Sequence, residues 1–164
     1  EVFKKEKELE FIQDNPIYYY PDSFKKEKKT IKKKKFIFHT WPYFNPTSTM
    51  VFRRNFLKKL LSKIKFSNKK FKKMFFDARA IIYIYFFSDK YLMSRKYLTI
   101  YTQNDKGDTI NNYGKKNFNW WKRRLEYHKF VESLFAKNNK YYNKFLDYYL
   151  TVIINKIYKL FGKT

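Results

Sequence analysis

The sequence contains no cysteine and only three glycines and four prolines in 164 residues. Without cysteine, the chain forms neither disulfides nor Cys-based metal sites. A Gly-rich phosphate-binding loop is also absent. There is no run of 18 apolar residues, so we expect no membrane-spanning helix. Residues 1–12 are charged throughout and do not resemble a secretory signal, which favours a cytoplasmic location.

Acidic residues are scarce. There are 14 Asp and Glu against 38 Lys and Arg, which gives a formal net charge of +24. Such a charge attracts a protein to nucleic acid or to the anionic inner leaflet of a membrane. The bias toward Lys, Asn, Ile, Phe and Tyr is also typical of AT-rich coding, so genomic drift is an equal explanation of the excess. Because 23% of the residues are aromatic, the chain can nevertheless bury a core.

Two helices are predicted in the middle of the chain. Residues 53–65 predict a helix with an apolar stripe of Phe52, Phe56, Leu60 and Ile64, joined by Leu57 and Leu61. Arg53 and three lysines take the opposite face. Residues 76–87 are apolar on nearly every side, which is typical of a buried helix. Their only charges, Asp77 and Arg79, stand in the first turn.

Strands and loops are predicted elsewhere from β-prone runs and turn signals. Residues 13–35 contain Asn-Pro and Pro-Asp pairs and a lysine run, so we expect a mobile surface insertion whose basic part is 22–35. Residues 47–52 are β-prone. Residues 90–94 and 97–101 predict two short strands or a hairpin.

Two further helices are predicted to close the chain. One carries His128 on its apolar stripe, where we interpret that residue as structural. The other repeats apolar residues from Tyr142 to Phe161. We expect this second stripe to pack into a core. The alternative is that its helix lies in a membrane interface, with Tyr and Phe inserted and Lys reaching outward.

The order of four stretches resembles the second half of a family 2 glycosyltransferase with the GT-A fold. The stretches are EVFKK, NPTSTMVFRRNFLKKLL, FFDARAIIYIYFF and YLMSRKYLTIYTQNDKG, and NWWKRRLEYHKFVESL resembles the helix that trails them. The resemblance implies an α/β fold: a partial GT-A-like mixed sheet, flanking helices and a C-terminal helical pair. It implies the acceptor-side part of a catalytic domain over 1–116, and a helical extension over 117–164.

The resemblance also implies roles for seven residues. Asp77 falls on the catalytic base. Arg79 is not part of this set; from its own chemistry we expect it to form a salt bridge with Asp77, the alternative being a contact with a phosphate. Thr47, Ser48 and Thr49 fall on the acceptor-side strand. Tyr101, Gln103 and Asn104 fall on the loop near the donor diphosphate. Since Thr102 and Asn104 replace an Arg and a His of the family pattern, contact of that loop with diphosphate or metal is in doubt.

The first half of such an enzyme holds the nucleotide sugar through an Asp-x-Asp motif, which this chain lacks. Together with the start at Glu1, this predicts a fragment that does not turn over alone. We expect the full enzyme to be bacterial, to act in cell-surface polysaccharide synthesis, and to use Mg²⁺ or Mn²⁺. The chain by itself would bind no metal. The donor would be a nucleotide sugar and the acceptor a glycan or a lipid-linked glycan.

Residue chemistry alone leaves alternatives open. Inverting sugar transfer needs one carboxylate to take the acceptor proton, and Asp77 at the start of an apolar helix suits that role. An aspartate there is also a helix cap. A basic module that binds nucleic acid or a membrane surface without catalysis is the competing function. A partial sheet would also leave edges through which the chain could self-associate.

Overall fold

The computed structural model describes residues 4, 7–28, 40, 46–65, 67–103, 117–144 and 146–161. The chain forms two compact units that interleave along the sequence. The first takes its described residues from Glu1–Lys33, Tyr43–Phe66 and Phe76–Asn104. The second takes its described residues from Lys34–Pro42, Ser67–Phe75 and Asp105–Thr164. The predicted helical extension therefore falls within the second unit.

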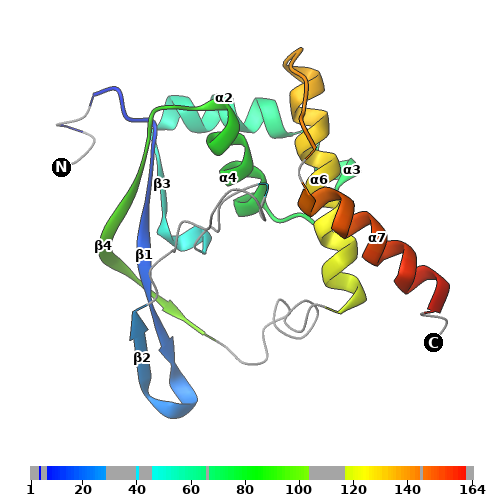
Figure 1. Cartoon of the computed structure of the whole chain (residues 1–164). Helices are drawn as coiled ribbons and strands as arrows, with labels where there is room; N and C mark the ends of the chain where they lie inside the picture. The colour runs from blue at the N-terminus through cyan, green and yellow to red at the C-terminus, as the bar shows by residue number, and fades with distance from the viewer. Residues whose placement is uncertain are drawn as a thin grey trace. The chain divides into compact units, whose positions relative to one another are not determined.

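The first unit is built on a mixed sheet, as the sequence predicts (Figure 1). Its central strand, β1 (Phe11–Tyr20), pairs in parallel with β4 (Tyr91–Thr102). At its two ends β1 pairs antiparallel with β2 (Lys25–Lys28) and with β3 (Met50–Phe52). Because β4 follows nearly all of β1, the two short strands share the opposite edge.

The expected mobile insertion at 13–35 is wrong for its first part. Residues 13–20 belong to the central strand. A turn of 3-10 helix, η1 (Pro21–Ser23), then leads into β2 through Phe24, whose φ of 53° lies in the left-handed region. Asn15-Pro16, read as a turn signal, sits where the register between β1 and β4 shifts. Proline fits there because it has no N–H to donate to a sheet ladder. Residues 29–35 lie outside the described residues.

A buried aspartate explains why β4 is one strand rather than the predicted pair. Gln13 pairs with Met93 but Asn15 pairs with Tyr97, so β4 carries extra residues opposite Asp14. The Asp14 carboxylate accepts hydrogen bonds from the Leu98 N–H at 2.9 Å and from the Thr99 hydroxyl at 3.2 Å. The side chain thus replaces ladder bonds that the irregularity interrupts.

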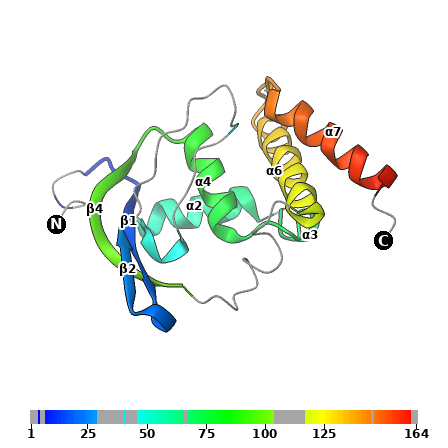
Figure 2. The same cartoon turned by 60° about the horizontal axis from the view of Figure 1, so that its bottom comes forward.

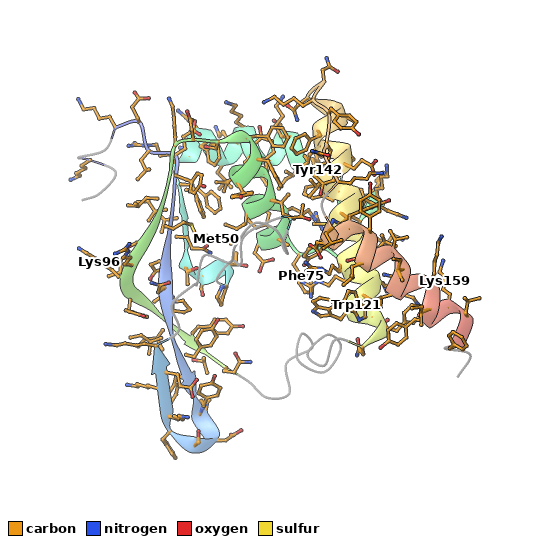
Figure 3. All side chains as sticks on the ribbon, in the orientation of Figure 1. Met50, Phe75, Lys96, Trp121, Tyr142 and Lys159 are labelled. Atoms are coloured by element: carbon orange, nitrogen blue, oxygen red, sulfur yellow. The ribbon has the colours of Figure 1, made fainter. Side chains whose placement is uncertain are left out.

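The irregularity in β4 also places the side chain of Lys96 on the outer side of the strand. Lys96 follows Ser94, whose hydroxyl accepts a hydrogen bond from the Lys96 N–H at 3.1 Å. The Lys96 side chain points away from the strands, as Figure 3 shows. The extra residues of β4 therefore bulge outward, while the Asp14 carboxylate lies inside.

Two helices cover one side of this sheet, and both views show them there (Figures 1 and 2). Helix α2 (Arg54–Ile64) buries Phe56, Leu60 and Ile64 of the predicted stripe. Leu57 is half-buried and Leu61 is exposed, so the prediction is confirmed in part. Helix α4 (Phe76–Phe87) begins and ends where the sequence predicts. It buries several adjacent positions, which confirms the buried-helix prediction; these are Ala78, Ala80, Ile81, Ile82, Tyr83 and Ile84.

The second unit consists of α3 (Ser67–Lys70), α6 (Phe118–Lys137) and α7 (Leu146–Phe161). Helix α6 begins after Asn117, whose side chain accepts a hydrogen bond from the Trp120 N–H at 3.0 Å. Helices α6 and α7 run antiparallel. Near the start of α6 the rings of Phe118 and Tyr158 stack at 5.3 Å, and further along α6 Arg124 meets Asp147.

Helix α7 turns its polar side inward. Asp147, Thr151 and Asn155 are buried, at a spacing of four residues that places them on one side of the helix. The opposite side is exposed, so the core-packing prediction is wrong for the part of the stripe that lies on α7, although Tyr142 before the helix is buried. We call this exposed side the α7 apolar face; it comprises Leu146, Tyr149, Leu150, Ile153, Ile157, Leu160 and Phe161.

Removing the Asp14 carboxylate should destabilise the first unit. In Asp14→Ala, the Leu98 N–H and the Thr99 hydroxyl lose a buried acceptor, so we expect the unfolding free energy to fall by about 1–3 kcal/mol. Urea denaturation followed by circular dichroism measures this change. Asp22→Ala, at an exposed position in η1, is the control and should change stability by less than about 0.5 kcal/mol. Equal losses in both variants would contradict the role of Asp14.

Candidate functional site

The predicted acceptor-side residues lie in η3 (Thr47–Thr49), directly before β3. The Thr49 side chain is buried and donates a hydrogen bond to the Pro46 carbonyl at 2.7 Å. Thr49 also accepts one from Gln13 Nε2 at 3.1 Å, which ties η3 to the central strand. Thr47 and Ser48 are exposed. Of the three hydroxyls, two therefore face solvent and one supports the backbone.

Asp77, the predicted base, is the second residue of α4 and is partly exposed. Its Oδ1 accepts a hydrogen bond from the Ala78 N–H at 2.7 Å, which satisfies one of the unpaired N–H groups of the first helical turn. Among the described residues, no other hydrogen bond to this carboxylate is found. Oδ1 therefore caps the start of the helix.

The start of α4 packs against β3. The ring of Phe76, the residue before Asp77, lies 6.2 Å from the ring of Phe52 at the end of β3. Phe52 in turn lies 5.0 Å from Phe11 in the central strand. Two stretches that are separate in the sequence, the η3–β3 element and the helix that carries Asp77, are thus held together by aromatic contacts.

Arg79 is not placed beside Asp77 by the helix. Residues two apart on an α-helix point in different directions, so their side chains do not face each other. The Arg79 side chain is half-buried, and other groups in the protein interact with it. Its predicted contact with Asp77 or with a phosphate stays a prediction.

Gln103 lies away from the η3–β3 element. The Gln103 N–H donates a hydrogen bond to the Tyr19 carbonyl at 2.7 Å, which places Gln103 near the C-terminal end of β1. Gln13 lies near the other end of that strand. Six residues of an extended strand separate Gln13 from Tyr19, or about 20 Å. Asn104 lies outside the described residues. The predicted residues therefore do not form one cluster.

Gln13 is a residue that the sequence reasoning missed. It is buried together with Asp14 and Asn15, although three successive residues of a strand point to alternate faces. Its contact with Thr49 joins the central strand to the predicted acceptor side. The polar run before Pro16 was visible in the sequence. It was interpreted as part of a loop because Asn15-Pro16 is a turn signal.

The second unit contains a buried ion pair that the sequence reasoning also missed. Arg124 holds Asp147 with two nitrogens, Nε to Oδ1 at 3.0 Å and an Nη to Oδ2 at 2.5 Å. The N–H and the hydroxyl of Thr40 both donate to Oδ2 at 3.3 Å. His128 Nε2 lies 3.5 Å from the same oxygen, and its side chain is 0% exposed.

Burial and charge shift the proton affinities of this cluster in defined directions. Burial acts to raise the pKa of Asp147, but contacts with His128 and Arg124 outweigh it and hold that pKa well below its usual value. Burial lowers the pKa of His128, although Asp147 opposes the effect. Burial raises the pKa of Tyr142 to about 12. At neutral pH the cluster therefore holds a carboxylate, a guanidinium and a neutral imidazole.

The spacing of polar residues in the sequence could have indicated this cluster. Arg124 and His128 are four residues apart on α6, and Asp147 begins the polar side of α7. The same side ends at Asn155, whose side chain donates to the Trp121 carbonyl at 2.9 Å. The cluster is buried, and its carboxylate is taken up by Arg124 and Thr40, so we interpret it as a structural ion pair.

Comparisons of the chain with protein-family models, with curated proteins and with solved structures gave no match. Within the described ranges, no three His, Asp or Glu side chains come close enough together to hold a metal ion. No helix in the described part of the chain combines the length and the apolar character needed to cross a bilayer.

Breaking the buried pair should strongly destabilise the second unit. Asp147→Asn leaves the Arg124 guanidinium without its carboxylate, so we expect a loss of about 3–5 kcal/mol in unfolding free energy. Thermal and urea denaturation measure it. Glu132→Gln removes the more exposed pair with Lys144 and should change stability far less, because solvent screens that pair. Comparable losses in the two variants would show that Asp147 is not the stronger tie.

Stability of the second unit should fall as the pH falls. Unfolded histidine binds a proton near pH ~6.5, whereas folded His128 stays neutral to a lower pH, so acid favours unfolding there. The lowered pKa of Asp147 adds stability above about pH 3.9, and this is lost with further acidification. Urea melts between neutral and acidic pH measure both phases. His128→Gln should flatten the first phase only; an unchanged slope would contradict the assignment.

Proposed function

We propose that this chain is the acceptor-side part of an inverting glycosyltransferase of the family 2 type, with Asp77 as the base. One observation carries the proposal. The helix start with Asp77 and the η3–β3 element, which the resemblance assigns to the same site, pack together through Phe76 and Phe52. A mixed sheet with helices on one side also agrees with a partial GT-A-like unit.

In this proposal, the acceptor lies over the exposed hydroxyls of Thr47 and Ser48, which can donate and accept hydrogen bonds. The acceptor hydroxyl attacks the anomeric carbon of the donor sugar and loses its proton to the Asp77 carboxylate. The anomeric carbon–phosphate oxygen bond breaks, and the nucleoside diphosphate leaves. Attack from the face opposite the leaving group inverts the anomeric configuration.

The donor diphosphate is bound elsewhere in this proposal. A divalent cation neutralises its charge when bound, and the carboxylates for that cation belong to a donor-binding part with an Asp-x-Asp motif. Among the described residues, we propose the Arg79 guanidinium and the Gln103 side-chain amide as substrate-binding groups. The chain alone supplies the base and part of the acceptor surface.

Asp77→Asn tests the base with little disturbance of the fold. The asparagine oxygen can still accept the Ala78 N–H bond, so the cap survives while the proton acceptor is lost. In the protein that joins this chain to its donor-binding part, we expect sugar transfer to fall by about 10²–10⁴-fold. Release of nucleoside diphosphate from a panel of nucleotide sugars, with a glycan acceptor, measures the rate.

Asp89→Asn is the matched control, because Asp89 is an exposed carboxylate of the same unit, and its transfer rate should be unchanged. Unchanged transfer in Asp77→Asn would remove the base from the proposal. If the chain instead holds single-stranded oligonucleotides at about 100 mM salt, with an affinity that falls steeply as salt rises, the nucleic-acid alternative replaces it.

A further inference from the structure

The strongest unused feature of the molecule is the α7 apolar face. Leu160 and Phe161 are 73% and 83% exposed, and the other members of the face are about half exposed. Their spacing along the helix gathers them within an arc of about 120° at ~100° per residue. A continuous apolar stripe of this kind marks an interaction surface, whereas single exposed apolar residues do not.

The hydrogen bonds of the opposite side prevent α7 from rotating this face inward. Arg124 and Thr40 hold Asp147 near the start of the helix. Asn155 holds the Trp121 carbonyl two turns later. A rotation that buried the apolar face would move a carboxylate away from its guanidinium and leave both groups unpaired. The apolar face is therefore a fixed feature of the folded unit.

The charges of α7 indicate what covers the face. Its only acidic residue, Asp147, is buried against Arg124, while Lys156 and Lys159 are exposed. Figure 3 shows Lys159 projecting from the last turn of the helix. A second copy would bring another chain of charge +24 against these lysines. A surface that combines apolar depth with negative charge complements both features.

We propose that the α7 apolar face docks on an anionic lipid surface, with α7 lying in the plane of the interface. The 16 residues of α7 extend about 24 Å, less than the ~30 Å hydrocarbon core of a bilayer. The apolar side chains enter the acyl boundary. The ammonium groups of Lys156 and Lys159 reach lipid phosphates along their own apolar stems. This proposal is independent of the glycosyltransferase assignment.

The absence of cysteine allows a direct test on the full chain. Ile157→Cys carries an environment-sensitive fluorophore into the α7 apolar face, and Leu98→Cys carries it to a more exposed apolar position on β4. With phosphatidylcholine vesicles that contain about one-third phosphatidylglycerol, we expect a blue shift at position 157 and none at position 98. Vesicles of phosphatidylcholine alone should give a much weaker shift at position 157.

Vesicle sedimentation separates apolar insertion from simple charge attraction. Ile153→Asn with Leu160→Asn leaves the charge at +24 and should reduce partitioning to the anionic vesicles by about tenfold or more. Leu98→Asn with Ile100→Asn removes comparable exposed apolar surface from β4 and should leave partitioning unchanged. Circular dichroism of both double variants should match the original chain, since all four positions are exposed.

Three results would overturn the proposal. Equal partitioning of the two double variants would show that binding is electrostatic and does not use the α7 apolar face. A blue shift at position 157 that grows with protein concentration without lipid would identify a second copy as the occupant. A shift produced by single-stranded oligonucleotides but not by anionic vesicles would identify a nucleic-acid surface.

Discussion

Each unit of this protein is stabilised from within by one buried carboxylate. Asp14 and Asp147 are two of only 14 acidic residues in a chain with 38 basic ones. Each accepts hydrogen bonds from a segment far away in the sequence: Asp14 from Leu98 and Thr99 on β4, and Asp147 from Thr40. A buried acceptor without donors costs more than a hydrogen bond gains, so each carboxylate fixes its neighbours in place. The scarcity of acids makes these two ties specific, because few other carboxylates compete for the donors.

The ion pair at Asp147 also determines which side of α7 is exposed. An amphipathic helix normally buries its apolar side, but the bidentate contact with Arg124 selects the polar side of α7 for burial. Because the polar side is buried, the α7 apolar face is exposed to solvent. Stability of the second unit and exposure of this face are therefore one property.

The spacing of apolar residues in the sequence predicted the helices that bury only apolar side chains. Helix α4 is apolar throughout and α2 has a single stripe, so their periodicity sufficed. The pattern failed where a polar group is buried. Strand β1 resembled a loop because Asn15 and Pro16 are turn residues, yet the irregular pairing with β4 accommodates both. The stripe of α7 was visible, but its direction depends on a partner on another helix, which the periodicity of one helix does not contain. At the candidate site, Asp77 was predicted from the resemblance and from its position before an apolar helix, whereas Gln13 was identified only through its contact with Thr49.

The two interpretations of Asp77, helix cap and base, do not compete for the same atom. Its Oδ1 receives the Ala78 N–H, which fixes the carboxylate on the rigid first turn of α4. A fixed carboxylate is what proton transfer requires, because the base must stand within hydrogen-bond reach of the attacking hydroxyl. The contact between Phe76 and Phe52 then fixes that turn against the strand that follows Thr47 and Ser48. In the proposed enzyme, the cap is thus the positioning device of the base, and the aromatic contact sets its place relative to the acceptor.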